Sequence, residues 1–286
     1  MGGDRLIMNG PREDESSISR ESNSRGCLKV SVAVAAYSIC SSLMLIVNKL
    51  AVTLVPAPSF VLLTQLISAT IGIRLMSMFR VIHAEGLELS KAKSYFAVSV
   101  AFLAALYTNV KTLQYANVET FIVFRSSTPI LISVLDWAFL GRSLPNGRSS
   151  VSLFGTLIGA IMYVRYDAQF EMRAYGWVLV WYFVFAFDQI FIKYVVDTVK
   201  LSVWGRSYYT NALATILVFI VGLVSNELHL LEKTYIDPRA LMVIALSCIL
   251  GVLMSYSSFL LREMISATSF TVIGTMCKIA TVIINL

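Results

Sequence analysis

The stretch FRSSTPILISVLDWAFLG (Phe124–Gly141) places an arginine near the start of an apolar segment of helix length. The residues before it, Glu119-Thr-Phe-Ile-Val-Phe, extend the apolar run in the other direction. A charged side chain in the middle of a membrane span costs on the order of 2.5–3.5 kcal/mol unless it meets a partner or a wet cavity. The question that this stretch raises is what holds Arg125 in place.

Composition identifies the environment of that segment. Hydrophobic residues make up 57% of the chain, charged residues make up 14%, and the mean hydropathy is +0.74. A soluble domain carries about 25% charged residues. Nine apolar runs, each about long enough to cross a ~30 Å hydrocarbon core, are separated by polar breaks. The sequence therefore predicts an all-α, polytopic membrane protein with spans at about 30–50, 58–79, 94–113, 118–140, 149–165, 174–196, 203–224, 240–262 and 268–286.

The basic residues predict the orientation of these spans. Residues 1–28 form a hydrophilic segment, which we expect to be a disordered cytosolic tail. Of the 23 Lys and Arg residues, thirteen lie in this tail and in the loops on its side, against five in the opposite loops. The positive-inside rule then places the N-terminus in the cytosol. The net charge of +6 reflects this topology, so we expect a lipid bilayer around the chain and no nucleic acid as a partner.

Basic residues also fall inside or at the edges of the predicted spans: Lys49, Arg74, Arg125, Lys193 and Lys278. Those near span ends can extend their charge to the interface. Arg125 and Lys278 lie near the midplane, in spans that enter from opposite faces. Pairing of one of them with Asp188, the main embedded acid, is one interpretation. Two midplane cations with few acids favour the other interpretation, an anionic ligand, as a carrier of a phosphorylated solute would require.

The segments that carry these two cations resemble each other. TFIVFRSSTPI (Thr120–Ile130) aligns without gaps with SFTVIGTMCKI (Ser269–Ile279), and a hydroxyl, a Phe, a Val and an Ile recur at matching places. Many secondary transporters are built from internal repeats with the binding site at their interface. A five-plus-five repeat requires ten spans. We therefore expect residues 29–286 to be a transporter domain that is truncated at its C-terminus and lacks the tenth span.

Other chemistry is not indicated by the sequence. It contains no Walker A loop, no GxSxG motif and no HExxH motif. The four cysteines show no CxxC spacing, and the two histidines are isolated. We expect neither an enzyme nor a metal site nor a cofactor.

Three stretches give the chain a resemblance to a known family: SSLMLIVNK (Ser41–Lys49), FRSSTPI (Phe124–Ile130) and GTMCK (Gly274–Lys278). They resemble the nucleotide-sugar transporters of the drug/metabolite transporter superfamily. Together with VDTVKLSVWGRSYYTN (Val196–Asn211), the chain is most similar to plant Golgi GDP-sugar transporters of the GDP-L-galactose or GDP-mannose type. GDP-sugar carriers have a Phe-Tyr-Asn-Asn motif in span seven and a Gly-Ala-Leu-Asn-Lys motif in span nine. Here these positions read Tyr-Tyr-Thr-Asn and Gly-Thr-Met-Cys-Lys.

The resemblance implies a function and a site. It implies exchange of a cytosolic GDP-sugar for lumenal GMP across the Golgi membrane, by alternating access around a central cavity. Lys278 would face the phosphates. The resemblance assigns guanine recognition to Asn211, Ser255 and Ser258, because a site built on hydrogen bonds rejects the wrong base well.

The sugar end and the lining of the cavity are implied by the same resemblance. Gly274 and Thr275 would face the sugar, and Tyr37 matches a tyrosine of the first span that lines the family's cavity. Phe270 stands where GDP-mannose carriers have a tyrosine, and the missing hydroxyl argues against mannose. Arg125 would belong to the cavity, where it either contacts phosphate or pairs with Asp188.

Several alternatives stay open at this point. One is the same fold carrying a UDP-sugar or a sugar phosphate. Another is a membrane scaffold that transports nothing, in which the embedded charges pair structurally. A homodimer is one arrangement that the sequence leaves open.

Overall fold

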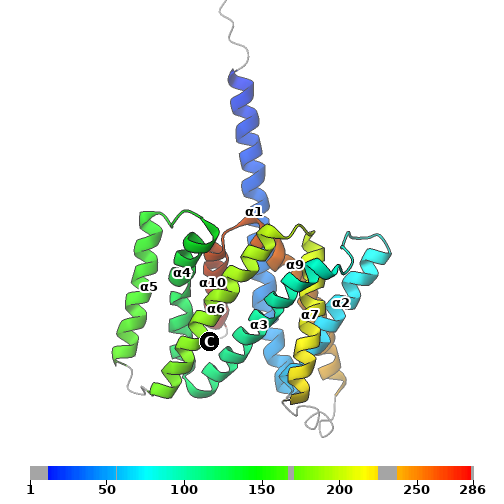
Figure 1. Ribbon diagram of the computed structural model, residues 1–286, viewed down its shortest axis with the longest axis vertical. Helices are drawn as coiled ribbons and strands as arrows, with labels where there is room; N and C mark the ends of the chain where they lie inside the picture. The colour runs from blue at the N-terminus through cyan, green and yellow to red at the C-terminus, as the bar shows by residue number, and fades with distance from the viewer. Residues whose placement is uncertain (1–11, 56, 167–170, 225–236, 285–286) are drawn as a thin grey trace, which may run out of the picture.

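The computed structural model describes residues 12–284 except residues 56, 167–170 and 225–236, and this part of the chain is a bundle of helices (Figure 1). The helices are α1 (Arg12–Leu54), α2 (Pro58–Met78), α3 (Leu89–Tyr115), α4 (Val118–Leu140), α5 (Gly147–Tyr166), α6 (Met172–Thr198), α7 (Val203–Val224), α9 (Pro238–Met264) and α10 (Ala267–Ile284). Each of the nine predicted runs corresponds to one of these helices. The all-α prediction is confirmed.

The surface of the bundle has the character of a membrane protein. Seven of the described helices are long and apolar enough to cross a bilayer, namely α1, α2, α3, α4, α6, α7 and α9. Large apolar side chains such as Phe139, Val151 and Ile161 are exposed on the outside, while Asp188 and Asn211 are buried. This distribution fits a lipid environment, because apolar side chains can face lipid whereas buried polar groups need internal partners.

The helix α1 begins at Arg12, within the segment for which a disordered tail was expected. It continues without a break into the bundle, and its first turns project beyond the other helices (Figure 1). Glu and Arg are good helix formers, and the segment is rich in both. Residues 1–11 lie outside the described residues, and a separate cytosolic tail stays a prediction.

The helix α4 contains the RSSTP sequence and remains helical through its proline. Pro129 has no N–H, so the carbonyl of Arg125, four residues earlier, loses its helical donor. The hydroxyl of Thr128 donates to that carbonyl at 2.7 Å and replaces the lost bond. The helix ends at Gly141, whose φ of +65° lies in the left-handed region that glycine adopts without steric cost.

One end of the bundle holds the ion pairs of the described residues. We call it the basic end; it is the end at which α2, α4, α6 and α9 terminate, uppermost in Figure 1. The ion pairs there are His83–Glu85, Lys91–Glu88, Arg142–Asp136, Arg142–Asp197, Lys193–Asp197 and Arg206–Glu263. These ion pairs link the connections and helix ends at this end of the bundle.

A contact between two connections adds to the closure of the basic end. Glu85, between α2 and α3, accepts hydrogen bonds from the Ser202 N–H at 2.9 Å and from the Ser202 hydroxyl at 2.8 Å. The same hydroxyl accepts from the Gly205 N–H at 3.0 Å and so caps the N-terminus of α7. Burial alone would raise the pKa of Glu85, but the hydrogen bonds from Ser202 outweigh burial and hold this pKa below its ordinary value.

We predict that this contact stabilises the protein in a pH-dependent way. Glu85→Gln should lower the unfolding temperature at pH 7, by an amount that corresponds to about 1 kcal/mol. The folded-state pKa is lowered, so the contribution is present above the ordinary pKa of the carboxyl and is lost as the pH falls through the lowered value. Thermal unfolding in detergent should therefore show a smaller difference near pH 3 than near pH 7. Glu171→Gln, at an exposed residue of the opposite end, serves as the control. An equal effect of Glu85→Gln at both pH values would contradict the prediction.

Candidate ligand-binding site

A cavity of about 380 cubic ångströms lies inside the bundle, and every described helix except α5 contributes to its wall. Its charged lining residues are Arg125, Asp188, Arg262 and Lys278. Three cations against one acid leave an excess of about two positive charges when all four groups are ionised. We refer to this space as the central cavity. Its charge suits an anion that carries about two negative charges.

Arg125 reaches the central cavity from α4 between two aromatic rings. Its guanidinium carbon lies 5.8 Å from the ring centre of Phe121 and 5.2 Å from that of Phe185. The rings offset part of the cost of the embedded charge. The Nε atom has no hydrogen-bond partner, and within the described part of the chain Arg125 forms no ion pair. Pairing with Asp188, one of the two interpretations of the sequence, is therefore not formed in this structure.

Lys278 approaches the same space from α10 and is half-buried. The charge that acts on its ammonium group is that of Arg125, which is of the same sign. No ion pair of Lys278 occurs among the described residues. Two neighbouring cations without a carboxylate repel each other in a medium of low dielectric. This repulsion is relieved when an anion enters the cavity.

Asp188 is associated with a different cation, Arg262, which is the last residue of the predicted span at 240–262. Arg262 donates through Nη2 to the side-chain Oε1 of Gln189 at 2.9 Å, and Gln189 donates through Nε2 to the Asp188 carboxylate at 3.0 Å. The electrostatic neighbour of Asp188 is Arg262. The spacing of Arg262 from the predicted site serines could have identified it as a residue of the same site. Arg262 follows Ser255 and Ser258 by seven and four residues, so all three lie on one face of a helix.

A cluster of amide and hydroxyl groups lies between α7 and α9. Asn211 donates through Nδ2 to the hydroxyl oxygens of Ser255 at 3.0 Å and Ser207 at 3.3 Å, and the two hydroxyls are 2.6 Å apart. Asn211, Ser255 and Ser258 all line the central cavity, as does Thr210, whose hydroxyl has no partner. Such groups can pair with the polar edge of a ring such as a nucleobase.

Four of the predicted site residues, Tyr37, Phe270, Gly274 and Thr275, are not among the lining residues of the central cavity. The rings of Tyr37 and Phe270 are 4.9 Å apart, and both side chains are buried. Gly274 lies against the Tyr37 hydroxyl, and Thr275 is also buried. The structure thus brings Arg125, Asn211, Ser255, Ser258 and Lys278 together at one cavity, while the other four do not line it.

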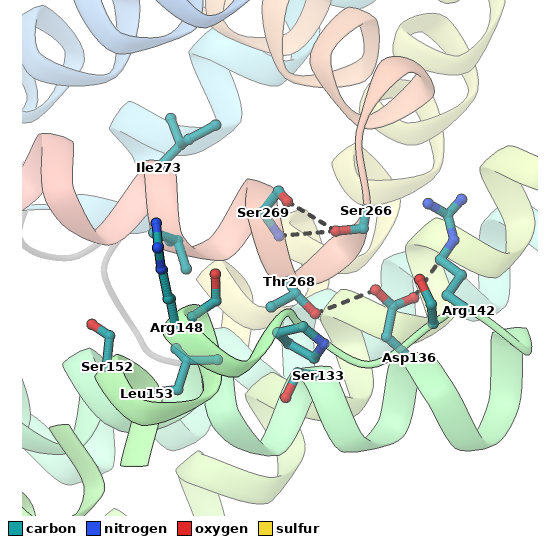
Figure 2. Close-up of a pocket in the computed structure, with 14 residues that line it drawn as sticks. Ser133, Asp136, Arg142, Arg148, Ser152, Leu153, Ser266, Thr268, Ser269 and Ile273 are labelled. Atoms are coloured by element: carbon teal, nitrogen blue, oxygen red, sulfur yellow. Dashed lines mark hydrogen bonds and ion pairs between the residues drawn. The ribbon is translucent and has the colours of Figure 1, made fainter. Parts of the chain in front are cut away.

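A second cavity, of about 810 cubic ångströms, lies at the basic end between α4, α5 and α10. Sequence reasoning did not identify it. Figure 2 shows Asp136 between Thr268 and Arg142, and the Thr268 hydroxyl donates to its carboxylate at 3.3 Å. Arg142 lies 3.8 Å from the same carboxylate. Ser266 caps α10 by accepting from the Ser269 N–H at 3.1 Å. None of the predicted site residues lines this second cavity.

Comparison with known proteins gives relatives along most of the chain. No family model matches it. The protein named GDP-fucose transporter 1 of Arabidopsis thaliana is 35% identical over 265 residues, which are 90% of this chain and 78% of that protein. The GDP-mannose transporter GONST3 of Arabidopsis thaliana is 33% identical over 258 residues, 88% of this chain and 69% of that protein. A more distant relative is the UDP-galactose/UDP-glucose transporter 7 of the same plant, at 23% identity over 85% of this chain and 76% of its own length.

The contact between Gly274 of α10 and Tyr37 of α1 generates a prediction about the packing of these two helices. A Cβ atom at Gly274 would lie 3.0 Å from the Tyr37 hydroxyl oxygen, and Tyr37 is packed against Phe270 and cannot easily move away. Gly274→Ala should therefore destabilise the protein by about 1–3 kcal/mol. A Cβ atom at Gly222 would lie 3.6 Å from the Ser59 side chain, an ordinary contact, so Gly222→Ala is the matched control. Equal unfolding temperatures for both variants would refute the prediction.

Proposed function

The chain belongs to the family of nucleotide-sugar transporters, and from this premise we propose that it exchanges a GDP-sugar for GMP. The central cavity, with its excess of positive charge, is the observation that carries this proposal. A nucleoside monophosphate bears about 1.5 to 2 negative charges at neutral pH. A nucleotide sugar keeps one acidic oxygen on each of its two phosphates. Both ligands therefore match the charge of the cavity, and their exchange moves little net charge across the membrane.

The two unpaired cations are assigned to the phosphates. Lys278 contributes a compact point charge, and Arg125 contributes a planar group suited to phosphate oxygens. Their mutual repulsion makes an anion the partner that completes the site. A scaffold without a ligand would have no means of compensating these charges.

The amide and hydroxyl cluster is assigned to the base. Asn211 offers an amide, and Ser255 and Ser258 offer hydroxyls, at the wall of the same cavity. Guanine presents both donors and acceptors along its edges, which an amide can match. The relatives at 33–35% identity carry GDP-sugars in their names, and the relative at 23% carries UDP-sugars. This ordering favours guanine. The sugar is to be decided among GDP-L-galactose, GDP-fucose and GDP-mannose by assay.

Alternating access gives a role to the ion pairs of the basic end. The basic end is the cytosolic end if the N-terminus is cytosolic, as the distribution of Lys and Arg predicts. There, Arg142 bridges Asp136 of α4 and Asp197 of α6, and Lys193 bonds to the same Asp197. In our proposal these contacts close the cytosolic end and break when the cavity opens toward the cytosol. We also propose that the protein lies in the Golgi membrane and that two copies form a homodimer.

Transport by reconstituted protein tests the assignment of Lys278. Liposomes loaded with GMP should take up labelled GDP-sugar, and Lys278→Ala should reduce uptake to background because the phosphates lose their fixed cation. Lys29→Ala removes an exposed lysine of α1 and should transport like the wild type. Uptake by folded Lys278→Ala within twofold of the wild type would remove this residue from the site. Preferred uptake of UDP-sugars by the wild type would replace the guanine assignment with the alternative ligand.

Asn211 provides a separate test of base recognition. Asn211→Ala removes a hydrogen-bonding group at the assigned base position, so competition by GMP should weaken more than competition by UMP. A loss of roughly tenfold for GMP is expected for one hydrogen bond in a buried site. Equal losses for GMP and UMP would mean that Asn211 acts on folding or on the shared phosphate. Thr215→Ala, which removes a hydroxyl that bonds within α7, is the control.

A further inference from the structure

Arg262 is a buried cation of the central cavity with incomplete hydrogen bonding. Its side chain is only 7% exposed, and its guanidinium carbon lies 3.8 Å from the ring centre of Phe270. The Nη2 atom donates to Gln189, while Nε and Nη1 have no partner. Buried donors without acceptors are costly, because water satisfies them in the unfolded chain. Two donor atoms of this residue therefore lack an acceptor among the described residues and would gain one if the side chain moved toward an anion.

The acid associated with Arg262 compensates it only in part. Asp188 holds one carboxylate oxygen toward Gln189 and leaves the other without a hydrogen bond. Within the described residues, Arg262 and Asp188 form no direct ion pair, and Gln189 lies between them as a bridge. A chain of partly satisfied polar groups in a low dielectric is poorly stabilised as it stands. An arginine with a purely structural role would be expected to meet its carboxylate directly.

We propose that Arg262 is a third phosphate-binding residue, which gives up its bond to Gln189 when a nucleotide enters the central cavity. This inference rests on the proposed function and extends it to a residue outside the recognised motifs. In the empty cavity, Gln189 and the ring of Phe270 hold the guanidinium. With ligand present, phosphate oxygens accept from its free donors. The negative charge of Asp188 then limits the positive excess of the cavity to about two charges. A ligand with two negative charges is therefore neutralised without being held so tightly that it cannot leave.

Arg262 also joins the central cavity to the ion pairs of the basic end. Its backbone carbonyl accepts a hydrogen bond from the Lys193 ammonium at 2.5 Å, and Lys193 also pairs with Asp197 at 2.9 Å. Asp197 in turn pairs with Arg142 at 2.9 Å. If the end of α9 moves together with the Arg262 side chain, phosphate binding acts on the contacts that close this end.

Binding of nucleotides and nucleosides to the purified full chain in detergent tests this role. Arg262→Gln should weaken GMP binding by roughly tenfold or more and leave guanosine binding unchanged, because only GMP has a phosphate. The same contrast should hold for UMP against uridine. Arg239→Gln, at an exposed residue near the start of the same helix, should bind all four compounds like the wild type.

A double variant separates phosphate binding from a structural pairing with Asp188. If Arg262 only neutralises Asp188, then Asp188→Asn combined with Arg262→Gln should restore GMP affinity to the wild-type value, which would overturn the proposal. If Arg262 binds phosphate, the double variant should stay weak for GMP. Arg262→Lys keeps the charge in case Arg262→Gln does not fold, and it should lose less GMP affinity than Arg262→Gln.

The outcomes also separate this inference from the proposed function. Wild-type GMP affinity in both Arg262 variants would exclude Arg262 from the phosphate site while leaving GDP-sugar transport standing. A wild type that prefers UMP to GMP would overturn the guanine assignment, and the contrast between UMP and uridine would still decide the role of Arg262. A wild type that binds no nucleotide would overturn both.

Discussion

The low dielectric inside the bundle makes each unpaired charge expensive, and Arg125 and Lys278 are two such charges side by side. Their arrangement organises what surrounds them. Aromatic rings flank the arginine, the lysine is only half-buried, and both face a cavity that is large enough for part of a ligand. Helices from both halves of the chain must meet around this space, since α4 and α10 bring the cations and α7 and α9 bring the amide and hydroxyl groups. The requirement for a counter-anion thus connects the fold to the function.

The contacts that close the basic end are of a kind that can be broken and remade. Asp197 and Arg142 are each about one-third exposed, and partly exposed ion pairs contribute only modestly to stability. Apolar contacts between helices elsewhere in the bundle cannot be broken as easily. Separating such helices would expose a large apolar area. A transporter that alternates between two states needs such modest contacts at the end that opens. In the proposed alternation between two states, ligand binding has only such modest contacts to offset at this end.

The sequence allowed the helices and part of the site to be predicted. The lengths of the apolar runs located all nine helices, because a membrane span must satisfy its backbone internally. Charges in the middle of those runs located Arg125 and Lys278. Arg262 was missed because it lies two residues from the end of α9, where an arginine can usually reach the interface. The partner of Asp188 and the placement of Tyr37 behind the wall depend on how each helix is rotated. That rotation follows from packing between helices and is not encoded in any local pattern.

The missing N–H of Pro129 gives α4 an uneven stiffness along its length. A helix flexes most easily where its hydrogen-bond ladder is interrupted, and here the interruption is bridged by a side-chain hydroxyl and not by the backbone. It falls between Arg125, which faces the central cavity, and Asp136, which anchors the basic end. The two arms of α4 thus meet where a side-chain hydroxyl stands in for a backbone hydrogen bond. A tilt of the arm that holds Arg125 relative to the arm that holds Asp136 would bend the helix at this point first.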